Sequence, residues 1–427
     1  MSDKSLFFHR DFRQLWIGDS ISQVGSAVTL LALPFLAIKV LDATPFEAAL
    51  LTMFQYLAFL LLGLPAGALV DRMRHRRVMI VGDLGRALLL GSVPVAYWLD
   101  VLTLGQLYAV TFGVSVLTLF FDVAYQSLLP QLVDDDRLME GNAKLEATRN
   151  VAEVGGPGLG GAIIAAVTAP AALAIDAVSF LVSAFFLGRI RRPEPKPERR
   201  PDAHLRREIG EGLRFVLRHP VLRPIATTAA ISNLFGTVGL SLLVVLLADT
   251  LKLSALLCGV VFSAAALGGI GGALLVERVV GWLGQGRALW MCMLTSTACW
   301  FLALPLYQAD WRLAGAVLLH GLGWITLIIF NITQVSFRQR VTPKPLMARM
   351  NATIRFLVWG AMPVGAFLGG VLAQTLGVRN AMWLGVTGEL LAVLPILLSP
   401  LRGMRELPAA PAEQEQEQEQ EQRPVAV

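Results

Sequence analysis

Long apolar runs alternate with short polar loops along nearly the whole 427-residue chain. About 20 apolar residues in a helix are enough to cross the hydrocarbon core of a bilayer. Twelve runs come near this length: residues 15–36, 46–70, 78–98, 106–129, 151–167, 171–187, 222–248, 256–276, 288–307, 313–335, 354–376 and 381–398. Only 16% of the residues are charged, whereas soluble domains carry about 25%. The sequence therefore predicts an all-α integral membrane protein with twelve transmembrane helices.

Basic residues gather in alternate loops. The loops on one side hold most of them: Lys4, Arg10 and Arg13; Arg72, Arg74, Arg76 and Arg77; and Arg338, Arg340, Lys344 and Arg349. The loops on the other side hold few charges: Asp42, Asp100, Lys252 and Arg379. Because loops rich in Lys and Arg stay in the cytoplasm, we expect both termini to be cytoplasmic. The same distribution explains a pI near 9.3 without a nucleic-acid partner.

Short motifs recur at a spacing of about 206–210 residues. Four recur in the same order: Ile21-Ser22-Gln23 as Ile231-Ser232-Asn233, Asp71-Arg72 as Glu277-Arg278, Asp122 as Asn331, and Gly160-Gly161 as Gly369-Gly370. Such internal repeats are typical of transporters with a site between two halves. We therefore expect two pseudo-symmetric six-helix halves, residues 1–188 and 221–401, a cytoplasmic linker at 189–220 and a disordered tail at 402–427.

The linker begins with a Pro- and Arg-rich stretch that disfavours helix. Residues 206–217 are amphipathic and could form a short helix on the inner leaflet, although a linker with some surface contact is the simpler interpretation. The tail alternates Glu and Gln over residues 413–422, which is typical of a solvated disordered segment.

The loop between the second and third runs carries a motif that fixes the family resemblance. Gly67, Asp71, Arg72, Arg76 and Arg77 resemble the signature of the major facilitator superfamily, with Arg74 in place of the usual small residue. The resemblance implies a gating motif, in which Asp71 accepts charge-assisted hydrogen bonds in one state of the carrier and releases them in another. The alternative is a topology signal alone.

The fifth run is rich in small residues. Gly156, Pro157, Gly160 and Gly161 are similar to a signature that accompanies exporters in the superfamily, although Ala152 replaces a further glycine. Simple close packing of helices is the alternative. Residues 121–133, with Leu138, Asn142 and Ala143, resemble the branch of enterobactin-type siderophore exporters and macrolide efflux proteins. This resemblance implies the plasma (inner) membrane of a bacterium.

In this fold, runs 1, 4, 7 and 10 are expected to line a central cavity. Acids inside a membrane are costly and are functional candidates by default, so Asp19 and Asp122 are the candidate proton sites; a helix cap or a bond to a neighbouring hydroxyl is the alternative. The candidates for the substrate cavity are Ser22, Gln23, Gln126, Asn233, Trp324, Asn331 and Gln334. Run 4 lacks the basic residue that proton antiporters of the superfamily usually carry.

These features predict a secondary active efflux transporter, driven by protons, that exports a hydrophobic or amphipathic small molecule. The chain lacks a Gly-rich loop for ATP phosphates, and its three cysteines lie in apolar runs, so we expect no cofactor and no metal site. The expected partners are membrane lipid, a small-molecule substrate and protons, with the chain as a monomer. An importer or facilitator of a polar nutrient is the alternative, and a receptor or enzyme is a further one.

Overall fold

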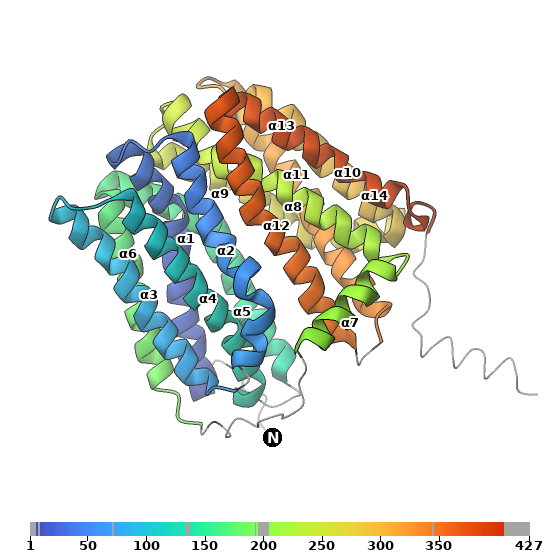
Figure 1. The fold of residues 1–427 in the computed structure, drawn as a ribbon, viewed down its shortest axis with the longest axis horizontal. Helices are drawn as coiled ribbons and strands as arrows, with labels where there is room; N and C mark the ends of the chain where they lie inside the picture. The colour runs from blue at the N-terminus through green and yellow to red at the C-terminus, as the bar shows by residue number, and fades with distance from the viewer. Residues whose placement is uncertain are drawn as a thin grey trace, which may run out of the picture.

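The computed structural model describes residues 6, 9–70, 72–133, 137–192, 194, 205–343 and 346–404. These residues form a bundle of long helices joined by short connections (Figure 1). The helices are α1 (Arg10–Val40), α2 (Pro45–Val70), α3 (His75–Trp98), α4 (Leu104–Leu132), α5 (Leu138–Ala166), α6 (Ala169–Gly188), α7 (Leu205–Arg218), α8 (Leu222–Val245), α9 (Ala255–Leu283), α10 (Gln285–Ala303), α11 (Arg312–Arg340), α12 (Met347–Leu376), α13 (Val378–Leu391) and α14 (Leu394–Leu397). Short turns η3 (Leu246–Thr250), η4 (Leu304–Leu306) and η6 (Pro400–Arg402) extend α8, α10 and α14.

Within the described residues, eleven helices are long and apolar enough to cross a membrane. The remaining crossing is α5, which starts thirteen residues before the predicted run at 151–167. Its first turns contain the charged residues Glu140 and Lys144. Because these residues are polar, the sequence pattern indicated a loop there. On a helix these residues are neighbours, and the Lys144 ammonium lies 3.1 Å from the Glu140 carboxylate. The predicted fold class, an all-α protein with twelve transmembrane helices, is thus confirmed.

The two halves repeat the same helix contacts. In the first half α1 packs against α5 and α6, while α2 and α3 both pack against α4. In the second half α8 packs against α12 and α13, while α9 and α10 both pack against α11. The repeat extends to the connections, because Asp42 after α1 and Lys252 after η3 both adopt a left-handed backbone, with φ of 50° and 53°. The sequence repeat is therefore a repeat in structure.

We call the end of the bundle that holds Arg72, Arg74, Arg76 and Arg77 the basic end, and the opposite end the far end. Three of the helices that begin at the far end, α4, α6 and α9, have hydroxyl caps. The side chains of Thr103, Thr168 and Ser254 accept hydrogen bonds from the backbone amides that start α4, α6 and α9. Such caps satisfy amides that would otherwise lack a partner at a helix start.

Glycines on α5 let this helix pack closely against two neighbours at once. A methyl group added at Gly160 would lie 3.1 Å from the Cα of Val28 on α1, and one added at Gly161 would lie 2.5 Å from the carbonyl oxygen of Ala255 on α9. The Ser263 hydroxyl on α9 also accepts a 2.8 Å hydrogen bond from the Gly158 amide. The fifth-run motif therefore forms the contact between the two halves, and close packing is observed there.

The equivalent glycines on α12 do the same in the other half. A methyl group at Gly369 would lie 3.1 Å from the Cα of Val238 on α8, and one at Gly370 would lie 3.0 Å from Ala49 on α2. We call these two contacts, α5 with α9 and α12 with α2, the glycine seam. Its two parts are related by the same repeat that relates the halves.

Buried apolar residues form separate cores at the two ends. The core at the far end draws on both halves, and joins residues such as Leu31 and Leu36 of α1 to Leu243 of α8 and Leu246 of η3. Toward the basic end, one core contains residues of the first half alone and another contains residues of the second half alone. The halves are thus sealed together at the far end and diverge toward the basic end (Figure 1).

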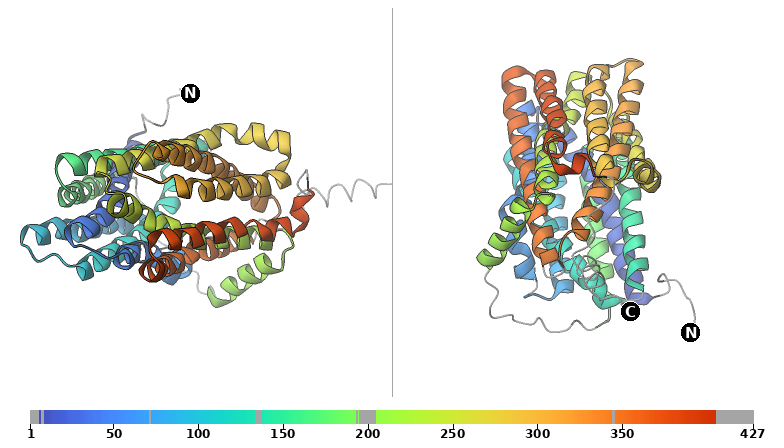
Figure 2. Two further views of the ribbon diagram at one scale, coloured as in Figure 1. Left: turned by 90° about the horizontal axis from the view of Figure 1, so that it is seen from above. Right: turned by 90° about the vertical axis from the view of Figure 1, so that its right-hand side faces the viewer.

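The amphipathic stretch of the linker is helical and packs against the second half. Helix α7 contacts α12, Val216 is fully buried, and Arg349 of α12 donates to the carboxylate of Glu211. Figure 2 shows α7 at the edge of the bundle. Residues 195–204 of the linker and 405–427 of the tail lie outside the described residues.

The glycine seam yields a stability prediction. Gly161→Ala should lower the thermal unfolding midpoint, because its methyl group meets rigid backbone on α9 and overpacking of this kind costs about 1–3 kcal/mol. Gly155→Ala on the same helix is the matched control, since a methyl group there meets nothing within 4 Å. The measurement compares the thermal unfolding midpoints of the two purified variants. Equal midpoints would contradict the prediction.

Candidate functional site

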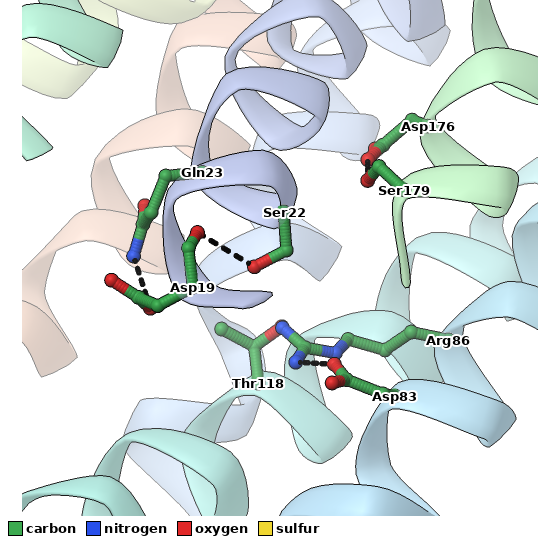
Figure 3. A network of polar contacts seen from close by, with 8 residues as sticks. All are labelled: Asp19, Ser22, Gln23, Asp83, Arg86, Thr118, Asp176 and Ser179. Carbon is green, nitrogen blue, oxygen red and sulfur yellow. Dashed lines mark hydrogen bonds and ion pairs between the residues drawn. The ribbon is translucent and has the colours of Figure 1, made fainter. Parts of the chain in front are cut away.

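A buried ion pair lies inside the first half (Figure 3). The Arg86 guanidinium of α3 donates to the Asp83 carboxylate one turn earlier, at an i,i+3 spacing that favours such pairs. The guanidinium also lies between the rings of Phe121 and Phe180, with its Cζ 4.3 Å from each ring centroid. Aromatic faces on both sides favour a desolvated cation, so Arg86 is held as a fixed positive charge within the membrane.

A second acid, Asp176 of α6, lies close to this pair. Its carboxylate accepts hydrogen bonds from the hydroxyls of Thr29 on α1 and Ser179 on α6. Only 1% of Asp176 is exposed, so its side chain is enclosed between helices. A methyl group at Gly25 would collide with the carboxylate, so a glycine on α1 makes room for the acid. The contact joins residues 147 positions apart, which sequence spacing alone does not reveal.

Asp19 lies within α1, and 4% of it is exposed. The Gln23 amide donates to its carboxylate at 3.4 Å, while the Ser22 hydroxyl donates to its backbone carbonyl at 3.0 Å. Since α1 begins at Arg10, Asp19 is nine residues inside the helix and does not cap it. Three of the predicted residues are therefore gathered around one carboxylate (Figure 3).

Asp122 of α4 is half-buried and faces charges from three other helices. Its carboxylate interacts electrostatically with Arg86 of α3, Arg149 of α5 and Arg355 of α12. Asp19 interacts with Asp122 as well. No side chain among the described residues donates a hydrogen bond to Asp122. The two candidate acids thus share one electrostatic environment, and Arg355 brings a charge from the second half into it.

None of these three arginines was predicted as a partner of the acids. Helix α4 lacks a basic residue, and the positive charge comes from neighbouring helices instead. Arg355 also lies over the aromatic rings of Trp359 at 5.1 Å and Phe59 at 5.9 Å. Phe59 belongs to α2, so Arg355 contacts the first half through a ring.

Two predicted amides of the second half lie together on α11. The Gln334 amide donates to the Asn331 side-chain oxygen at 3.3 Å, and the Arg338 guanidinium reaches the Gln334 oxygen at 3.5 Å. Asn233 of α8 instead donates to the carbonyl of Ala229 in its own helix. In the described residues, no hydrogen bond joins these amides to the acids of the first half.

Trp324 belongs to an aromatic cluster between α10 and α11. Its ring packs edge-on against Trp300, with centroids 6.3 Å apart, and the Trp300 N–H donates to the backbone of His320. The His320 ring lies 2.8 Å from the Tyr307 hydroxyl, so this histidine has a polar partner and a packing role. Gln126 of α4, the last predicted cavity residue, is exposed.

The loop between α2 and α3 is anchored within its own half. The Arg76 guanidinium donates to the carbonyls of Leu187 and Gly188 at the end of α6, and the His75 amide donates to Glu194. Arg72 and Arg77 are exposed, and a methyl group at Gly67 would meet nothing within 4 Å. Asp71 lies outside the described residues. In this conformation the described part of the gating motif therefore makes its contacts with α6.

The fold agrees with comparisons to known proteins. A family described as transmembrane secretion effector matches residues 2–426 of the chain. The chain belongs to this family. It is therefore a multi-pass transporter of the major facilitator superfamily, and not an enzyme.

Curated relatives are similar over nearly their whole length. The transporter YfiS of Bacillus subtilis is 27% identical, over 92% of this chain and 94% of the relative. The multidrug efflux pump Tap of Mycolicibacterium fortuitum is 28% identical, over 88% and 93%. The enterobactin exporter EntS of Escherichia coli O127:H6 is 25% identical, over 94% of each chain.

Solved structures share the fold. A bacterial homologue of the iron transporter ferroportin, in its inward-facing state, superposes with a TM-score of 0.74 at 19% identity, over 94% of this chain and 100% of that one. A second solved structure, that of the nucleoside transporter NupG, superposes with a TM-score of 0.70 at 12% identity, over 91% and 99%.

The buried ion pair yields a second prediction. Arg86→Met should lower the thermal midpoint strongly, because breaking a buried pair leaves the Asp83 charge uncompensated and costs about 3–5 kcal/mol. Adding Asp83→Asn should restore part of the loss. Thermal unfolding of the two single variants and the double variant measures the coupling. The exposed pair of Asp310 and Arg312 is the control, and Asp310→Asn should leave the midpoint unchanged; additive losses at residues 83 and 86 would contradict the prediction.

Proposed function

We propose that this transporter exports hydrophobic or amphipathic small molecules, such as drugs, siderophores or other natural products, in exchange for protons. The observation that carries the proposal is the charge cluster around Asp19 and Asp122, to which both halves contribute. A proton that binds at this place changes the charge balance between the halves, which is what coupling requires. The names of Tap and EntS as efflux proteins and the exporter-type motif of Gly156, Pro157, Gly160 and Gly161 support the direction.

Alternating access follows from the way the halves are joined. The far end is sealed by a shared apolar core, whereas the cores toward the basic end are separate. The glycine seam lets the halves rock against each other with little side-chain rearrangement. In the opposite state the basic end would close, and the gating motif of Gly67, Asp71, Arg72, Arg76 and Arg77 would then contact the second half.

The polar groups present favour an amphipathic substrate over a polar nutrient. Asn233 is already bonded to its own helix, and Asn331 is bonded to Gln334. Few side-chain donors and acceptors are thus left for a polar ligand, which would need most of its groups satisfied. Ser22, Gln23 and Gln126 would bind the polar part of a substrate, and Trp324 would serve as an apolar wall.

The basic end is proposed to face the cytoplasm of a bacterium, with both termini on that side of the inner membrane. In this orientation the structure opens toward the cytoplasm, where an exporter collects its substrate. The proposed partners are membrane lipid, protons and the exported molecule, and the transporter is proposed to act as a monomer of two halves, residues 1–188 and 221–401.

The proposed function is tested by transport in everted membrane vesicles. Uptake of siderophores and antibiotics into these vesicles should depend on an imposed proton gradient, and should vanish when the gradient is dissipated. Vesicles without the protein are the control. Uptake of a polar nutrient in the opposite direction, with no effect on any amphipathic compound, would favour the importer instead.

A third prediction concerns Asp122. Asp122→Asn should abolish accumulation against a gradient and retain exchange of labelled compound, because the amide resembles the protonated acid and cannot release a proton. The measurement compares uphill uptake with exchange in the same vesicles, using a compound identified by the screen. Asp19→Asn should have the same effect if the two acids share the proton. Uphill uptake with an unchanged dependence on the pH gradient in Asp122→Asn would show that the acid is structural.

A fourth prediction concerns topology. Cysteines introduced at Thr44 and Asp100, both exposed at the far end, should react with an impermeant thiol reagent added to intact cells. A cysteine at Arg218, exposed at the end of α7, should react only after the membrane is opened. The native cysteines are buried and need not be removed. Labelling of the Arg218 position from outside would reverse the proposed orientation.

A further inference from the structure

The second half contains a buried acid that neither the predicted site nor the proposed mechanism uses. Glu389 lies on α13, against α8, and 3% of it is exposed. The Ser232 hydroxyl of α8 donates to its carboxyl oxygen Oε1 at 3.2 Å. Among the described residues, this is the only hydrogen bond to the side chain.

The backbone of α8 leaves space for this carboxyl group. A methyl group added at Gly236 would lie 3.0 Å from Oε1 of Glu389. Gly388, the preceding residue of α13, packs against the ring of Phe235. The carboxyl group is thus enclosed where two helices approach each other closely, with a glycine on each of them.

Among the described residues, no cationic side chain forms an ion pair with Glu389. The charged and titratable groups on the helices that pack against α13, and on α13 itself, are Arg223 of α8, Arg287, Cys292 and Cys299 of α10, Arg349 and Arg355 of α12, and Arg379 of α13. Arg349 pairs with Glu211, Arg355 lies over Trp359, and Arg379 donates to the carbonyl of Tyr307. The Glu389 carboxyl group is buried and accepts a hydrogen bond from the Ser232 hydroxyl.

Asp176 occupies a similar position in the first half, but hydroxyl donors and a nearby cation stabilise its negative charge. It also lies on the last helix of its half, faces a glycine of the first helix and accepts from a hydroxyl of that helix. However, it has a second hydroxyl donor in Ser179, and the charge of Arg86 acts on it. In the described part of the chain, Glu389 has one hydrogen-bond donor and no cationic partner.

We propose that Glu389 binds a proton in the conformation seen here and is the proton site of the second half. An ionised carboxylate without a cation is costly to bury, whereas the neutral acid is tolerated with few hydrogen bonds. The carboxylate gains one proton at an oxygen, and it loses that proton when α8 and α13 separate enough to admit water. The role in coupling rests on the proposed proton-driven export, but the protonation itself does not.

Infrared difference spectroscopy in lipid tests the protonation. At neutral pH the C=O stretching band of a protonated carboxyl group should be present in the wild type and absent from Glu389→Gln, which keeps the size and shape of the side chain. Loss of carboxylate bands instead would overturn the proposal. If Glu389→Gln does not fold, Ser232→Ala replaces it in the test. Removing the Ser232 donor should raise the frequency of the C=O stretching band. An unchanged frequency would mean that the band does not belong to Glu389.

Transport then tests the role in coupling. Glu389→Gln should retain exchange and lose at least tenfold in uphill accumulation, whereas normal, pH-dependent accumulation would overturn the coupling role. The exposed acid Asp310 gives the control variant, Asp310→Asn, which should behave like the wild type. If the wild type shows no proton-driven uptake of any compound, the proposed export fails while the infrared result still decides whether Glu389 is protonated.

Discussion

The glycine seam is the contact on which the rest of the structure depends. Gly161 meets the backbone of Ala255 and Gly259, and Gly370 meets the side chains of Ala49 and Phe46, so the two halves touch closely at both places. Without a hydrophobic driving force inside lipid, helices associate through such close packing. The two contacts are related by the internal repeat and lie on either side of the molecule. A rotation of one half against the other can therefore keep both contacts while the two ends open and close.

Charge is distributed unequally over this nearly symmetric frame. Among its described residues, the first half contains three buried acids, Asp19, Asp83 and Asp176, and the half-buried Asp122, with Arg86 fixed between aromatic rings. The second half contributes Arg355 to the same region and keeps Glu389 apart. The repeat pairs Asp122 with Asn331, which cannot ionise. The helix contacts of the two halves are thus related by the repeat, whereas their buried charged residues are not.

The sequence predicted the fold well because lipid leaves few choices: a helix of sufficient length is the only structure that satisfies the backbone of each apolar run. The start of α5 was predicted incorrectly, because the charged residues of its first turns resemble the composition of a loop. The Asp83–Arg86 pair is visible in the sequence, because residues three positions apart are neighbours on a helix. The sequence did not reveal Arg149 or Arg355 near Asp122, or Thr29 near Asp176, because these contacts depend on how separate helices are rotated toward one another.

The apolar seal at the far end has a consequence for the resting carrier. To open that end, the contact of Leu31 and Leu36 with Leu243 and Leu246 must be exposed to water, at a cost of about 25 cal/mol for each Å² of apolar surface. An empty carrier has no ligand to offset this cost. The empty transporter is therefore expected to keep its far end closed. A bound substrate must stabilise the state in which the far end is open. The apolar contact at the far end therefore opposes the opening of an empty transporter.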